Sequence, residues 1–425
     1  MPRLTALLAL LLAAHAAPAG AVSMGGDAPL SEAPAAPGAA QPALAALARG
    51  DLAAAERGFS DLLRAQPASA LAHLGLADLR FRAGDAAGAE ALLRQGIAAN
   101  GDTPEAAALW RALARLQGRT GRVEEMLAAF GEARRIAPRD PTNPLQLANI
   151  LHQRLGRPAD ALPLYEMAIA LAPDLADAHY GGGLALARVG RPAEALAPLA
   201  RAAVLAPQSG LPDHARGQVL AGLGRPGEAL AAYDRALTRE PGLLDTRLAR
   251  GGLLLAALAR PADAAAEYTR AAALAPQLAG PRIGLGIARE RAGDAAGAER
   301  AYREALEREA ANPIAQNNLA WLLASQRRSL DEALALAERA SAALPGEPGA
   351  LTTLGWVRRQ RGELAEAEPL LARAVAAQPT AERLARLGTV RAELGRRPEA
   401  EADFRRALEL DPAQPLAREG LARPR

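Results

Sequence analysis

The chain has no cysteine and no lysine among its 425 residues. The first absence excludes disulfides, thiolate metal ligands and cysteine nucleophiles. The second excludes Schiff-base chemistry on a lysine amine and the lysine of a phosphate-binding P-loop. All 50 basic residues are therefore arginine, and they are interleaved with 47 acidic residues to give a formal charge of +3. Because no basic block stands out, the sequence does not predict a nucleic-acid-binding protein.

Aromatic residues are also scarce, at 3% of the chain, although half of the residues are hydrophobic. Alanine and leucine supply most of that half. Sheets favour β-branched and aromatic side chains, whereas alanine and leucine are strong helix formers. The composition therefore predicts helices that pack closely through small side chains.

Long apolar runs are missing beyond the N-terminus, where Leu4 to Ala14 follows the positive charge of Arg3. This run is too short to span a bilayer comfortably. Ala19-Gly20-Ala21 fits the small-x-small rule for signal cleavage. We therefore expect a signal peptide over residues 1–21, with an uncleaved membrane anchor as the alternative. No cysteine follows the run, which excludes a lipoprotein.

Residues 22–39 are rich in Ala, Pro and Gly and lack helical periodicity, which predicts a flexible linker. No later segment is long and apolar enough to cross a membrane. We therefore expect an exported protein that is periplasmic or associated with the cell envelope and has no transmembrane segment after cleavage.

One phrase, Ala-x3-Tyr/Phe-x2-Ala, recurs along the chain, and a proline follows it in most copies. Most steps between the positions that close successive units are 33 to 35 residues. A fixed period in this range indicates a solenoid, in which each unit buries its apolar face against its neighbours. The phrase opens with these pairs: Ala161 and Tyr165, Ala229 and Tyr233, Ala264 and Tyr268, Ala298 and Tyr302, and Ala400 and Phe404.

Glycine and proline punctuate most units. A glycine ends the expected first helix, and a proline ends the second. This punctuation predicts about eleven helical hairpins over residues 40–412, followed by a short capping helix or tail over 413–425. The hairpin that contains Met126 carries extra residues, so we expect a local distortion or bend there. Gly217, Gly252 and Gly286 recur within the first helices, which predicts close contact between helices.

These residues closely resemble the tetratricopeptide repeat family, whose pattern has a small residue in the first helix and Ala, an aromatic residue, Ala and Pro in the second. Gly252, Ala264, Tyr268, Ala271 and Pro276 match it position by position. The resemblance implies an all-α fold, a right-handed α-solenoid of antiparallel hairpins. It also implies a non-enzymatic scaffold whose first helices line a concave face that binds protein or peptide partners.

An alternative function comes from residues 317–324, Asn-Asn-Leu-Ala-Trp-Leu-Leu-Ala. This stretch resembles a variant of bacterial envelope repeat proteins, including proteins of exopolysaccharide and exosortase systems. The alternative is an accessory subunit of polysaccharide synthesis or export machinery. An enzyme is the third hypothesis, although signal, linker and repeats leave no room for a catalytic domain.

No residue pattern predicts catalytic chemistry, a metal site or a cofactor. The histidines after the signal, His73, His152, His179 and His214, fall in different hairpins at different phases. They do not form the helical His-x3-His or Glu-x2-His spacing that binds zinc.

The candidate binding residues lie on the expected first helices. Arg111, Arg115, Arg154 and Arg188 take phases that face the concave side, where arginine could hold an acidic partner segment or a polysaccharide component. The alternative is a solvated face of an arginine-rich protein.

Three further candidates, Asn317, Trp321 and Trp356, take similar phases, and the two tryptophans are one repeat apart. Exposed neighbouring tryptophans would form a binding hot spot, whereas buried ones would only pack between helices. Both interpretations remain open from the sequence.

Overall fold

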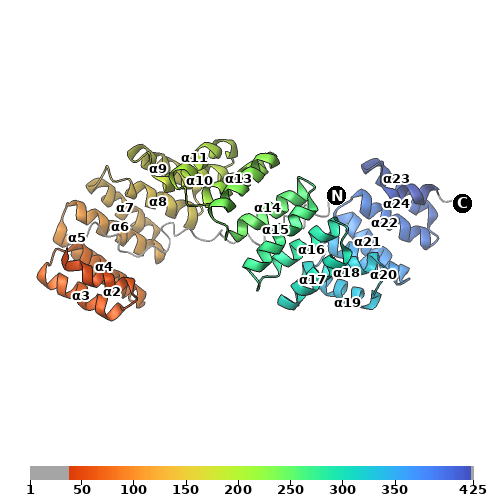
Figure 1. The fold of residues 1–425 in the computed structure, drawn as a ribbon, viewed down its shortest axis with the longest axis horizontal. Coiled ribbons are helices and arrows are strands. Elements are labelled where there is room, and N and C mark those ends of the chain that lie inside the picture. The colour runs from red at the N-terminus through yellow and green to blue at the C-terminus, as the bar shows by residue number, and fades with distance from the viewer. Residues whose placement is uncertain (1–37, 423–425) are drawn as a thin grey trace. The chain divides into compact units, whose positions relative to one another are not determined.

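The computed structural model describes residues 38–422, which divide into two compact units, 38–240 and 241–422. Within this range the chain forms helices and no strand (Figure 1), which confirms the all-α fold class. The predicted signal peptide and nearly all of the predicted linker lie outside the described residues. In this range no helix combines the length and apolar character that membrane crossing requires.

The first unit consists of six helical hairpins, in which we call the first helix A and the second helix B. In chain order the pairs are α2 (Gln41–Ala48) with α3 (Leu52–Ala65), α4 (Ala70–Arg82) with α5 (Ala86–Asn100), α6 (Pro104–Arg119) with α7 (Val123–Ile136), α8 (Thr142–Asn149) with α9 (Pro158–Leu171), α10 (Ala176–Arg188) with α11 (Pro192–Leu205), and α12 (Leu211–Gly222) with α13 (Pro226–Arg239). A 3₁₀ turn, η1 (Gly38–Ala40), precedes α2.

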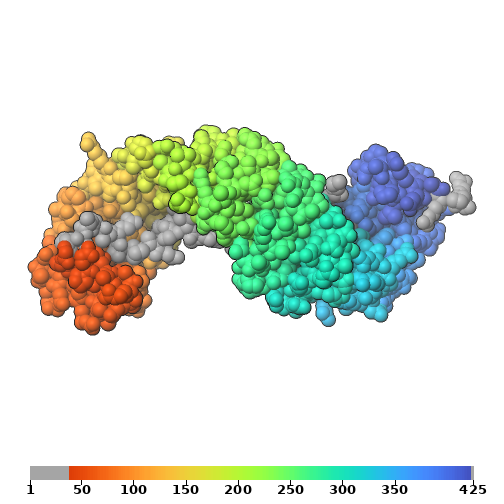
Figure 2. Space-filling model, viewed as in Figure 1, coloured from red at the N-terminus to blue at the C-terminus, as the bar shows by residue number. Residues whose placement is uncertain are grey.

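The second unit consists of five hairpins and a final helix. The pairs are α14 (Leu244–Ala256) with α15 (Pro261–Leu274), α16 (Gly280–Arg291) with α17 (Ala295–Arg308), α18 (Pro313–Ser325) with α19 (Leu330–Ala343), α20 (Pro348–Gln360) with α21 (Leu364–Ala377), and α22 (Ala381–Glu393) with α23 (Arg397–Leu410). Helix α24 (Pro415–Ala422) packs against both α22 and α23. In both units, hairpins that follow one another along the chain pack side by side (Figure 2).

The turn between helices A and B is set by a residue in the left-handed conformation. Glycine takes positive φ there in nine hairpins, because it has no Cβ to clash with the following carbonyl. The other two hairpins place Ala259 and Arg327 in the same conformation, each with a φ of 52°. The nine glycines are Gly50, Gly84, Gly121, Gly156, Gly190, Gly224, Gly293, Gly362 and Gly395.

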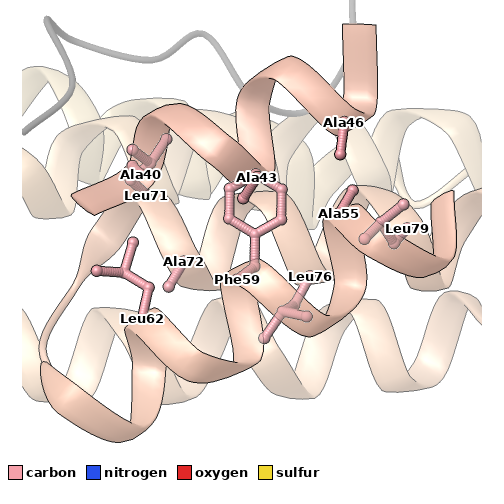
Figure 3. Packing of buried hydrophobic residues seen from close by; sticks show 10 residues of the cluster. All are labelled: Ala40, Ala43, Ala46, Ala55, Phe59, Leu62, Leu71, Ala72, Leu76 and Leu79. Carbon is pink, nitrogen blue, oxygen red and sulfur yellow. The ribbon is translucent and has the colours of Figure 1, made fainter. Parts of the chain in front are cut away.

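The core of each hairpin is a large B-helix side chain held between two A helices. In the first core, which Figure 3 shows, the fully buried Phe59 ring points toward Ala43 of its own hairpin. On the other side, a Cβ added to Gly75 of α4 would lie 2.6 Å from Phe59 Cε2. Such a distance is too short for any side chain, so glycine at this position lets the next hairpin approach.

The same arrangement recurs through both units. A Cβ on Gly217 would lie 2.5 Å from Tyr233 Cε1, and a Cβ on Gly286 would collide with Tyr302. Gly252 is buried in α14, and its neighbour Gly251 faces the Tyr268 ring. The alanines and rings of the repeated phrase are all buried; these are Ala161, Tyr165, Ala229, Tyr233, Ala264, Tyr268, Ala298, Tyr302, Ala400 and Phe404.

We expected a distortion in the hairpin that contains Met126, but the irregular segment lies in the next hairpin. Helix α6 takes up the extra residues by extending to 16 residues, and Met126 is fully buried against Gly118. The irregular segment lies in the following A helix, where α8 continues as a π-helix, η2 (Ile150–Arg154). Asn149 ends α8 at the position that is Gly or Ala in the other hairpins, 16 residues before the B-helix ring.

Candidate partner-binding face

Most successive A helices within a unit contact one another directly. In the first unit α4 contacts α6, and α10 contacts both α8 and α12. In the second unit α14, α16, α18, α20 and α22 contact one another in order. The B helices of the described residues make no comparable contacts with one another. We call the surface formed by the A helices of a unit its A-helix face. It is continuous through all five A helices of the second unit, whereas in the first unit α6 makes no comparable contact with α8.

Two tryptophans meet on the A-helix face of the second unit. The ring centroids of Trp321 on α18 and Trp356 on α20 are 6.4 Å apart, with an angle of 32° between the ring planes. Trp356 is 8% exposed, whereas Trp321 is only partly buried. Trp356 therefore packs between helices, whereas Trp321 keeps exposed surface, and its role in binding stays a prediction.

Two arginines complete this cluster. Arg386 of α22 lies over both rings, with its Cζ 4.6 Å from the Trp321 centroid and 5.1 Å from the Trp356 centroid. Arg359 lies over Trp356 at 4.5 Å, and its Nε donates to Glu393 Oε2 at 3.0 Å. Cation–π contacts of this kind hold a guanidinium and a ring in a fixed arrangement. Three A helices are thus joined through alternating aromatic and cationic groups.

Arg386 itself is almost completely buried. Its Nη1 lies 2.6 Å from Glu382 Oε1, and burial lowers the pKa of Arg386 while the Glu382 carboxylate opposes that change. Sequence reasoning missed this residue because it lies one turn before Thr389, which is the counterpart of Trp356 in its hairpin. The only signal in the sequence was that Arg386 lies one turn away from the tryptophan position, on the A helix that follows α20.

Asn317 lies one turn before Trp321 on α18 and is 8% exposed. Its Nδ2 lies 3.4 Å from Asn318 Oδ1, and its Oδ1 has no hydrogen-bond partner within the described part of the chain. The residue therefore belongs to the same face as the tryptophans, but most of its surface is covered.

The four arginine candidates do not form one exposed strip. Arg111 is mostly buried, and its Nη1 donates to Asp140 Oδ2 at 2.6 Å and to Asn143 Oδ1 at 3.1 Å. Arg115 is 4% exposed and donates to Gln146 Oε1 at 2.8 Å. These groups join α6 to the start of the next hairpin, so the expectation that these two arginines are exposed is wrong.

Arg154 and Arg188, by contrast, are exposed. They are the members of the predicted set that keep accessible charge. Their role in binding stays a prediction.

Many of the other arginines form ion pairs within or between hairpins. Arg157 pairs with Asp160 at 2.6 Å across the first turn of α9, and Arg225 pairs with Glu228 in the same way on α13. Between hairpins, Arg122 donates to Glu90 at 2.6 Å, and this hydrogen bond lowers the pKa of Glu90. Exposed pairs contribute little stability individually, about 0–1 kcal/mol each. Their main effect is that the charges of these arginines are already paired with carboxylates of the same chain.

The histidines do not converge. His73, His152 and His214 are buried in three hairpins, and His179 is partly exposed on a fourth. Over residues 38–422, no three His, Cys, Asp or Glu side chains are grouped as a metal site would require.

Comparisons with known proteins agree with this repeat architecture. Two tetratricopeptide repeat family models match the chain, one over residues 46–116 and the other over 150–210, 283–348, 329–382, 352–415 and 385–423. These matches cover more than half of the chain. The chain belongs to the tetratricopeptide repeat family. The predicted resemblance is therefore confirmed.

One curated relative is the TPR repeat-containing protein PA4667 of Pseudomonas aeruginosa, which is 34% identical over 99 residues. That match spans 23% of this chain and 17% of the relative's length.

Among solved structures, the chain is similar to one in the APC/C hetero-tetramer Cut9–Hcn1, with 13% identity and a TM-score of 0.49, covering 90% of this chain and 95% of that one. YrrB, described as a TPR protein with an unusual peptide-binding site, has 22% identity and a TM-score of 0.38, covering 44% and 95%. The fold assignment rests on the helices and the family matches.

Proposed function

We propose that this tetratricopeptide repeat protein is a non-enzymatic scaffold of the periplasm or cell envelope that binds segments of partner proteins on its A-helix face. The observation that carries the proposal is the Trp321–Trp356 pair on the A helices of consecutive hairpins, with Trp321 partly exposed. Tryptophan is enriched among the residues that dominate binding energy at protein interfaces. Continuous faces of stacked repeats are suited to extended partner segments.

A second feature supports a partner with acidic groups near the first unit. Arg154 and Arg188 are exposed and lie on consecutive A-helix segments. Arginine binds carboxylates through paired hydrogen bonds, so an acidic side chain is the complementary group. The envelope location rests on the predicted signal peptide of residues 1–21.

Site-specific photo-crosslinking in cells tests the binding face. A photoreactive phenylalanine derivative at position 321 keeps an aromatic ring there, and the same group at Arg300, which is exposed on α17, is the matched control. We expect discrete protein adducts from position 321 and none from position 300. Equal adducts at both positions, or none at either, would contradict the proposal.

The identity of the adducts separates the two scaffold hypotheses. Components of a polysaccharide synthesis or export machine would favour the accessory-subunit alternative that residues 317–324 suggest. Other envelope proteins would favour a general scaffold.

A further inference from the structure

Histidine is unevenly distributed between the two compact units. All four histidines of the described region lie in residues 38–240, and residues 241–422 contain none. Three of them, His73, His152 and His214, are each 3% exposed. Histidine is the side chain whose charge changes most readily between pH 5 and 8. Burial disfavours the charged imidazolium, because the imidazolium loses its hydration.

His152 and His214 each pack against the B-helix tyrosine of their own hairpin, and His152 also lies close to the tyrosine hydroxyl. The Tyr165 hydroxyl donates to Asn149 Oδ1 at 2.8 Å, and His152 Nδ1 lies 3.4 Å from the same hydroxyl oxygen. The two rings meet edge-on, with centroids 6.2 Å apart and an angle of 86°. Tyr165 is itself the B-helix ring that fills the core of this hairpin. A change at His152 therefore acts directly on the packing of α8 against α9.

The backbone at this point is also irregular. Leu155 N–H donates to Ile150 C=O at 3.1 Å, and Arg157 N–H donates to Leu151 C=O at 2.7 Å, across five and six residues. A π-helix of this kind is rare and often marks a functional position. Asn149 supplies a physical cause, because its side chain occupies a position where other hairpins need only Gly or Ala beside the ring. The wider turn makes room for it.

The charged groups near His152 do not favour an imidazolium. Arg188 of α10 is a cation and lowers the pKa of His152 further. On α9, Tyr165 stays neutral because burial raises its pKa. Asp160 pairs with Arg157 on the exposed side of α9. No carboxylate of the described residues pairs with His152.

We infer that the hairpin of residues 142–171 is an acid-sensitive joint: an imidazolium at His152 cannot stay buried without a paired carboxylate, so its protonation opens this hairpin, while the histidine-free residues 241–422 keep their fold. This regulatory device is additional to the proposed scaffold function. It would alter the surroundings of Arg154 and Arg188, so a partner held there would be released in acid.

The sign follows from proton linkage. Burial is the main cause that lowers the pKa of His152 from 6.5 to about 4, so the open hairpin binds a proton more readily than the closed one. Stability from this group is fully present above pH 6.5 and is lost as the pH falls toward 4. From these two values the open fraction should rise roughly twentyfold between pH 7 and pH 5.

Asp177 on α10 acts in the opposite direction. Burial raises the pKa of this carboxyl, so its protonation favours the closed form. It therefore cannot cause the loss of stability in acid.

Hydrogen–deuterium exchange of the whole mature chain at pH 7 and pH 5, corrected for intrinsic exchange rates, tests the inference. We expect peptides from residues 142–171 to lose protection about twentyfold in acid. Peptides from residues 280–393 of the same molecule serve as the internal reference and should change little. His152→Gln, which cannot be protonated, should abolish the acid effect, whereas His179→Gln, at a partly exposed site, should retain it.

Unchanged protection of residues 142–171 in the wild-type chain would overturn the inference, and so would an equal acid effect in His152→Gln. If His152→Gln does not fold, the inference is still tested in the wild-type chain by comparing residues 142–171 with residues 280–393. Equal loss of protection in residues 280–393 would also overturn it.

Discussion

Replacing Gly284 by Ala should test the packing rule of the solenoid most directly. Tyr268 of α15 lies between two glycines: a Cβ on Gly284 of α16 would be 2.5 Å from Tyr268 Cε1, and a Cβ on Gly251 of α14 would be 3.0 Å from Cζ. The ring is 6% exposed. A methyl group at position 284 therefore pushes the ring toward a helix that leaves no space for it.

The expected magnitude is a balance of two terms. Alanine favours a helix over glycine by about 1 kcal/mol, and overpacking a core costs about 1–3 kcal/mol. Because the ring is held on both sides, we place the overpacking term at the upper end. The free energy of unfolding should fall by about 1–2 kcal/mol.

A double-mutant cycle separates this collision from other effects. Leu199 and Ala215 of the first unit already pack together in one buried cluster, with leucine where position 268 has tyrosine and alanine where position 284 has glycine. Tyr268→Leu should therefore relieve the collision, and the Gly284→Ala change should cost less in that background by about 1 kcal/mol or more. Each variant is compared by its urea midpoint in a Trp110→Phe background, where tryptophan emission reports only on residues 241–422.

A helix position with open space provides the control. Gly131 lies within α7, is exposed and has no atom within 4 Å of an added Cβ. Gly131→Ala should therefore raise stability by about 0.5–1 kcal/mol, which circular dichroism would follow. A Gly284→Ala midpoint at or above that of the wild type would refute the packing argument.

Three further predictions concern the turns, the core and processing. Ala259→Gly should stabilise the chain by about 1 kcal/mol in thermal unfolding, because Ala259 has a φ of 52° that glycine adopts without strain. Ala264→Leu should cost about 1–3 kcal/mol because Ala264 is fully buried, whereas Ala266→Leu on the exposed side of the same helix should be nearly neutral by urea unfolding. Intact-mass measurement of periplasmic material should give a chain that starts near Val22, and full-length cytosolic protein would contradict export.

Local residues explain why the architecture could be predicted from the sequence. A glycine such as Gly224 takes a left-handed φ, and a proline such as Pro226 starts the next helix, whatever the distant parts of the chain do. Buried positions follow from the 3.6-residue period within each helix. Because both signals repeat many times, an error in one unit does not alter the overall assignment.

The site could be predicted only in part, because it depends on contacts between hairpins. Trp321 and Trp356 share a repeat position, so their proximity followed from the period. Arg386 stacks on both rings from a different turn of α22, and the repeat period gives no signal for that contact. The position of the π-helix was missed for a similar reason, since it depends on how Asn149 packs against Tyr165.

Arg115 is an arginine that its own helix suggests is exposed, but that in fact joins two hairpins. Replacing it should therefore lower stability. Its helix alone suggests a solvated arginine, but α8 covers it and Gln146 accepts its hydrogen bond. Arg115→Glu would place a carboxylate in a buried site beside the Gln146 oxygen, at a cost of about 3–5 kcal/mol. Arg154→Glu at an exposed site should change stability by no more than about 0.5 kcal/mol. Thermal unfolding distinguishes the two variants, and equal midpoints would mean that Arg115 is solvated.

If Arg115→Glu is destabilised as expected, a loss of partner binding in this variant would reflect a damaged hairpin. Arg154 and Arg188 are therefore the positions where charge reversal tests recognition itself.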